Sequence, residues 1–72
     1  MKLHELIPQF PLFAVYFKAV TNPNLSREVR HDAAMRAKGF LCCLMSLSKI
    51  SADDYGEMCE QIRNRLDAEG QL

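Results

Sequence analysis

A run of six apolar residues, FLCCLM at positions 40–45, is the strongest constraint on how this 72-residue chain can fold. Apolar side chains recur around the run at spacings of four, three, four and three residues, through Ala33, Ala37, Phe40, Leu44 and Leu47. This heptad spacing predicts a long helix. The run itself is apolar on every side of such a helix and needs cover on every side. One partner helix cannot supply that cover, so the pattern predicts a helical bundle.

The residues after this helix predict a tight turn and a second helix. Ser51 is a favourable N-cap, and Asp54 stands three residues later, where a capping box places an acidic acceptor. An apolar stripe follows at helical spacing, through Tyr55, Met58, Cys59, Ile62 and Leu66. We therefore expect helices over residues 25–49 and 52–69, folded into an antiparallel helical hairpin.

The N-terminal segment predicts two short helices, over residues 2–7 and 11–20. Pro8 restricts the residue before it, whereas Pro11 suits the first turn of a helix. A single helix from Pro8 that tolerates Pro11 is the alternative. The expected fold is all-α, a single domain over residues 1–72 with short N-terminal helices packed on the long hairpin.

Apolar content favours self-association. Hydrophobic residues make up 49% of the chain, more than a two-helix hairpin can hide, and a chain this short buries only about 60% of its unfolded surface. We expect a homodimer that forms a dimeric helical bundle, with a monomeric globule of three or four helices as the alternative. The residues expected in the core or dimer contact are Phe40, Leu41, Leu44, Met45, Tyr55, Met58, Cys59, Ile62 and Leu66.

Charge is balanced overall but not along the chain. Nine Lys and Arg residues face nine Asp and Glu residues, so no strong field directs the molecule to nucleic acid or to a membrane. Residues 1–50 hold seven basic and three acidic residues, and residues 51–72 hold two and six. Neutralisation between antiparallel helices is one interpretation, and a basic face aimed at a partner is the other. The N-terminal apolar stretch is short and contains Lys18, which argues against a membrane anchor and predicts a cytoplasmic protein.

The sequence carries no recognisable catalytic or metal-binding motif. Cys42, Cys43 and Cys59 lack Cys-x-x-Cys spacing, and we interpret them as reduced, buried small hydrophobic residues. The acidic residues are accounted for by helix caps, helix dipoles and solvated faces. We therefore expect no metal, no cofactor and no enzymatic activity.

Aromatic residues suggest a protein partner. Four of the six aromatics lie between residues 10 and 17. They either cover the apolar run or form a surface that binds another protein, in which case the candidate binding residues are Phe13, Tyr16, Phe17 and Lys18. We expect a small regulatory or adaptor protein with a larger protein partner whose identity the chain does not reveal. Chains of this size and style are common among accessory proteins of bacteria, phages and plasmids.

Nucleic-acid binding is the alternative function. The basic strip that would contact phosphates consists of Arg27, Arg30, His31 and Lys38 on the long helix. The layout from residue 27 to residue 66, with SADDYGEMCEQI opening its second half, resembles the small plasmid copy-control proteins of the repressor-of-primer type. That resemblance covers about half of the chain. It implies a dimeric four-helix bundle that binds paired RNA loops, but the family has no aromatic leader like this one, so no functional residue is transferred. A purely structural subunit of a larger assembly is a third reading.

Overall fold

The computed structural model describes residues 2–70, with side chains for residues 2–68, and this part of the chain is all helical. The four helices are α1 (Leu3–Gln9), α2 (Pro11–Val20), α3 (Arg27–Ser46) and α4 (Ala52–Gly70). No strand forms within residues 2–70. The prediction of an all-α fold with four packed helices is therefore confirmed.

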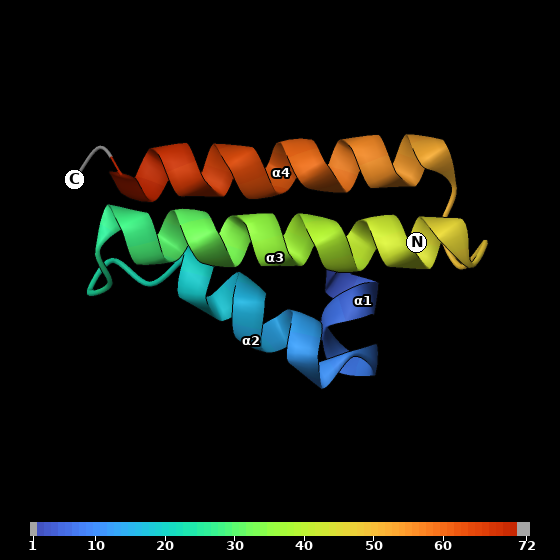
Figure 1. The fold of residues 1–72 in the computed structure, drawn as a ribbon, viewed down its shortest axis with the longest axis horizontal. Helices are drawn as coiled ribbons and strands as arrows, with labels where there is room; N and C mark the ends of the chain where they lie inside the picture. Colours follow the sequence, from blue (N-terminus) through green and yellow to red (C-terminus); the bar gives the residue numbers. More distant parts are fainter. Residues whose placement is uncertain (1, 71–72) are drawn as a thin grey trace.

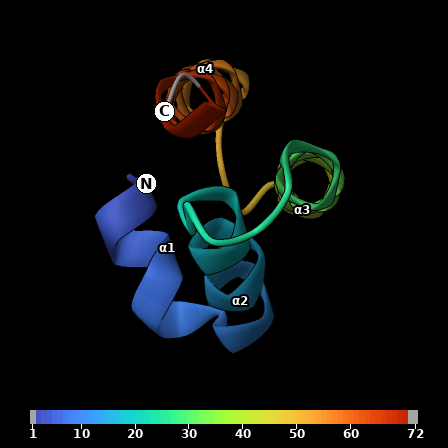
Figure 2. The same ribbon diagram turned by 90° about the vertical axis from the view of Figure 1, so that its left-hand side faces the viewer.

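Helix α3 packs against both α2 and α4. It runs antiparallel to α4 along the long axis of the molecule, and α2 crosses beneath it (Figure 1). Viewed along that axis, α1, α2 and α3 lie in sequence across the molecule, with α4 on one side of them (Figure 2). Helix α2 packs mainly against α3 and also reaches α4, whereas α1 packs on α2.

Helix α3 is shorter than the predicted span of residues 25–49. It begins after Ser26, whose Oγ accepts a hydrogen bond from the Val29 amide at 3.2 Å. It ends at Ser46 in a Schellman motif, in which the amides of Ser48 and Lys49 donate to carbonyls of the last turn at 3.0 and 2.8 Å. Ser48 takes a left-handed conformation with φ of 59°, a position that usually holds glycine.

The early end of α3 shortens the predicted row of apolar residues that runs from Ala33 to Leu47. Leu47 falls in the turn instead of on the helix, and 63% of it is exposed. The row of apolar residues on α3 therefore ends at Leu44, which is 6% exposed, and not at Leu47.

The N-terminal helices divide near the predicted place. Phe10 has extended backbone angles and separates α1 from α2, which begins at Pro11. Helix α1 nevertheless continues through Pro8 to Gln9, two residues beyond the predicted end. A proline at this point removes the bond to the carbonyl of His4, and His4 is exposed, so water can satisfy that carbonyl.

Aromatic contacts join α2 to α3 in the core. The Phe13 ring lies 5.7 Å from the Phe40 ring and 6.4 Å from the Phe17 ring, and Phe10 meets Phe40 edge-on at 5.6 Å. Such pairs add to the stabilisation that burial of the rings supplies. The fully or nearly buried apolar residues come from all four helices and the last turn: Leu6, Phe13, Val20, Ala33, Ala34, Ala37, Leu41, Leu44, Ile50, Met58, Ile62 and Leu66. Of the residues predicted for the core or dimer contact, Phe40, Met45, Tyr55 and Cys59 are half-buried against this core.

The FLCCLM run is covered on two sides only. Leu41 and Leu44 are buried between α2 and α4, but Cys42 and Cys43 are exposed. The prediction that these two cysteines are buried is wrong for the single chain, because no helix within residues 2–70 packs on the third side of α3. Cys59 is half-buried, closer to the prediction.

Candidate protein-binding surface

Helix α2 presents a second apolar face to solvent. We call this face the outer stripe, formed by Leu12, Val15, Tyr16 and Ala19 at the spacing i, i+3, i+4 and i+7. Leu12 is 54% exposed and Val15 is 61% exposed, while Tyr16 and Ala19 are half-buried at the edge of the core. A ten-residue helix with apolar side chains on both faces has more apolar surface than its own fold covers.

The structure divides the four predicted partner-binding residues between core and surface. Phe13 is 0% exposed, so its predicted place on a binding surface is corrected to the core. Tyr16 and Phe17 are half-buried, and Lys18 is exposed. The sequence interpretation missed Leu12 and Val15 as binding candidates, although their spacing to Tyr16 and Ala19 was the signal that could have identified them.

Charged groups border the outer stripe. Arg36 on α3 forms a 2.9 Å ion pair with Asp32, one turn earlier on the same helix. The Asp32 carboxylate raises the pKa of Arg36, and the Tyr16 hydroxyl of α2 acts in the same direction, which places Tyr16 beside Arg36 where α2 meets α3. Lys18 makes no ion pair with any described residue. Lys18 is therefore a cation beside the outer stripe that has no counter-charge in the described part of the chain.

The predicted basic strip is not assembled on the surface. Arg27 and His31 are exposed and Lys38 is half-buried, but Arg30 is only 5% exposed. Its Nε donates to the Leu25 carbonyl at 3.3 Å, and its Nη1 is buried without a hydrogen-bond partner among the described residues. Arg30 is thus corrected from a phosphate contact to a core residue, because it shares the inner face of α3 with the buried alanines.

Acidic residues interrupt the cations that remain exposed. A shallow pocket of ≈ 430 Å³ is lined by Arg27, His31, Glu28, Asp32 and Met35. Two of its five lining residues carry carboxylates. Their charge opposes the accumulation of phosphate groups on this part of α3.

Two of the three cysteines, Cys59 and Cys42, lie near the hydroxyl of Tyr55. The Cys59 thiol, one turn after Tyr55 on α4, raises the pKa of the Tyr55 phenol. Within the described residues, no group of three or more His, Cys, Asp or Glu side chains is placed to hold a metal ion.

Comparisons with known proteins found no match. No protein-family model matches the chain, and no curated protein or solved structure was found to be similar to it. None of the helices in residues 2–70 is long and apolar enough to cross a membrane.

Proposed function

We propose that this protein is a small non-enzymatic regulator or adaptor that binds a larger protein through the outer stripe of α2. The observation that carries the proposal is the half or greater exposure of Leu12 and Val15 on a helix that buries Phe13 and Val20 completely on another face. Large apolar side chains grouped on one surface favour protein contacts. We place the protein in the cytoplasm, as the sequence predicts.

An amphipathic helix is the partner element that fits this stripe best. A helix laid along α2 would cover residues at the i, i+3, i+4 and i+7 positions with its own apolar face. An acidic residue at its edge would meet Lys18, which has no ion-pair partner in the described part of the chain. That charge would favour the correct orientation more than it would raise the affinity.

We also propose that two copies associate through the open side of α3. Gly39, Cys42, Cys43 and Ser46 are exposed on this side, and none of them carries a charge. A second copy would give the FLCCLM run the cover that its apolar composition requires. Sedimentation equilibrium tests this part: we expect a dimer for the native chain and a folded monomer for Cys42→Arg. A native chain that sediments as a monomer at about 100 µM would contradict the dimer.

Substitution on α2 tests the binding surface. We expect Val15→Asp to abolish retention of the partner protein from native cytosol on the immobilised chain, with an unchanged circular-dichroism melt. The matched control is Val29→Asp on the first turn of α3, where Val29 is 50% exposed. Equal retention by Val15→Asp and the native chain would refute the assignment of the outer stripe.

Nucleic-acid binding receives less support from the arrangement of charges. Arg30 is buried, and Arg27 and His31 share their pocket with Glu28 and Asp32. Few cations of the predicted basic strip are then free for phosphates, and salt-dependent affinity scales with the number of such cations.

A further inference from the structure

Helices α1 and α4 leave an open groove between them, on a different part of the surface from the outer stripe. Its volume is ≈ 860 Å³, within the range typical of ligand sites. The apolar part of its lining comes mainly from Leu3 and Ile7 of α1 and Phe17 of α2, all of them half-buried. The groove therefore offers apolar surface that the fold of the single chain does not cover.

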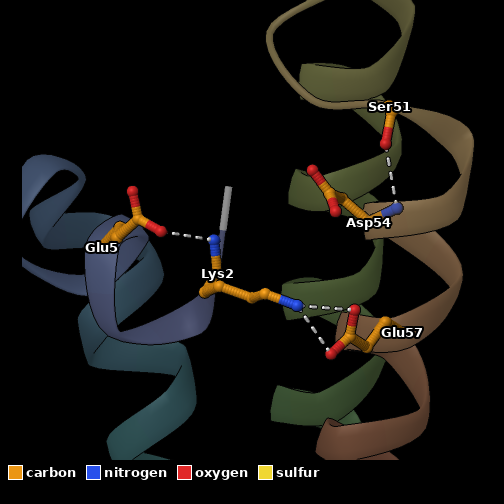
Figure 3. Close-up of polar contacts among 5 residues, drawn as sticks. All are labelled: Lys2, Glu5, Ser51, Asp54 and Glu57. Atoms are coloured by element: carbon orange, nitrogen blue, oxygen red, sulfur yellow. Dashed lines mark hydrogen bonds and ion pairs between the residues drawn. The ribbon is translucent and has the colours of Figure 1, made fainter.

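An ion pair links the two walls of the groove. Lys2 Nζ lies 3.0 Å from both carboxylate oxygens of Glu57, while the Lys2 amide donates to Glu5 Oε1 at 3.2 Å (Figure 3). The hydrogen bond to Glu57 raises the pKa of Lys2. The charges of Lys2 and Glu57 thus compensate each other and are not the groups that a ligand would need to neutralise.

Beyond the Lys2–Glu57 ion pair, the α4 side of the groove carries polar side chains that have no partner among the described residues. Gln61, Asn64 and Arg65 line the groove at i, i+3 and i+4 spacing. All three are exposed, and none has a side-chain hydrogen bond or ion pair within the described residues. Two amides, each a donor and an acceptor, and one guanidinium fork therefore line the groove without a partner among residues 2–68.

These groups favour an extended peptide over a helix. The main-chain groups of a helix are hydrogen-bonded to one another, so a bound helix would offer no main-chain partner to the Gln61 and Asn64 amides. An extended peptide presents free N–H and C=O groups that the amides can pair. The wall from Glu57 to Ala68 is about 16 Å long, at about 1.5 Å per helical residue. That length holds about five extended residues, at about 3.3 Å each.

We propose that the α1–α4 groove binds an extended, apolar peptide segment of a partner protein that carries a carboxylate at one end. Gln61 and Asn64 bond its main chain, its apolar side chains lie on Leu3, Ile7 and Phe17, and Arg65 binds the carboxylate through its planar fork. The complementarity is specific, because Arg65 is the groove cation without a counter-charge among the described residues. This site is separate from the outer stripe and does not depend on the function proposed for it.

Nuclear magnetic resonance of the full chain tests the proposal. The probes are N-acetylated pentapeptides in which Leu, Val or Phe alternates with Ala and the last residue is Asp. We expect them to shift the side-chain amide resonances of Gln61 and Asn64. Amidation of the peptide's carboxylates, or Arg65→Gln, should weaken binding by about tenfold or more. Arg63→Gln is the matched control, since Arg63 is an exposed cation that lines a different pocket, with Lys38 and Glu60.

Three results would overturn the assignment. The first is the absence of any shift with these peptides at about 1 mM, the weak limit of useful affinity. The second is an equal loss of binding in Arg63→Gln and Arg65→Gln. The third is binding of octanoate as tight as that of the peptides, because octanoate has no main chain and would show that the groove takes any apolar carboxylate.

Discussion

Replacement of Arg30 by methionine should stabilise the protein. Arg30 is 5% exposed, its Nη1 is buried without a partner in the part of the chain that the structure describes, and its Nε bond to the Leu25 carbonyl is 3.3 Å long. No described carboxylate lies within ion-pair distance of it. A buried guanidinium in this setting loses hydration that the protein only partly replaces. Methionine fills much of the same space with an unbranched apolar chain.

The size of the stability change follows from the Nε hydrogen bond and the buried Nη1 of Arg30. The bond to Leu25 is longer than the usual 2.9 to 3.0 Å, so its loss should cost no more than about 1.5 kcal/mol. Removal of the stranded donor should recover about 1 to 3 kcal/mol, and more where the charge is desolvated. We expect the free energy of unfolding to rise by about 1 kcal/mol. For a domain of this size the melting temperature should then rise by about 4–8 °C.

Thermal denaturation followed by circular dichroism measures this change. The matched control is Arg27→Met, because Arg27 is exposed on the first turn of the same helix and should alter stability by less than about 0.5 kcal/mol. A fall of about 4 °C or more in Arg30→Met, with no change in Arg27→Met, would show that the buried guanidinium is net stabilising and would refute this reasoning.

Three further changes test the local structure. Ser48→Gly should raise the free energy of unfolding by about 1 kcal/mol in urea denaturation, because Ser48 has a φ of 59°; destabilisation would contradict the left-handed turn. Gly56→Ala should add about 0.5–1 kcal/mol, since a methyl group there meets no described atom within 4 Å beyond its chain neighbours and its own helix backbone, and a loss of stability would reveal a contact that the single chain lacks. The third change is in pH: Cys59 raises the pKa of Tyr55 above 10.0, so the folded state holds the phenol proton more tightly than the unfolded state. That contribution is present below pH 10 and is lost as the pH rises through the raised pKa, so the melting temperature should fall as the pH rises above about 10, and by less in Tyr55→Phe; an equal fall in both proteins would contradict the assignment.

Local chemistry explains which parts of the fold were predictable. The break before Pro11 and the cap at Ser51, whose Oγ accepts from the Asp54 amide at 3.0 Å, depend on neighbouring residues and can be read from a short stretch of sequence. The end of α3 could not be read in this way. Ser48 adopts a conformation that glycine normally supplies, so no residue in the sequence marks the turn there.

The burial of a side chain depends on which helices pack around it, and the spacing of apolar residues along the sequence does not reveal this. Arg30 precedes Ala33 and Ala37 at i+3 and i+7, so its place on the inner face was visible, but its charge favoured a surface interpretation. The opposite error occurred at Cys42 and Cys43, whose apolar character suggested burial. They are exposed in the single chain because α2 and α4 leave one side of α3 open.

The candidate site was half predictable for a similar reason. The aromatic segment was correctly placed on a helix, but the choice between core and binding surface was posed for the whole segment. The structure gives each face of α2 a different environment: Phe13 and Val20 are 0% exposed, whereas Leu12 and Val15 are more than half exposed. Which face turns inward is set by the contacts of α2 with α3, and these lie far away in the sequence.

Two adjacent residues provide the most direct test of the central claim that α2 stabilises the fold with one face and binds a partner with the other. Leu12→Ser and Phe13→Ser should be compared for melting temperature and for the partner protein retained from native cytosol. We predict that Leu12→Ser melts like the native chain but retains much less partner, whereas Phe13→Ser loses about 3 kcal/mol or more of stability. Full retention by Leu12→Ser, or a normal melt for Phe13→Ser, would contradict the claim.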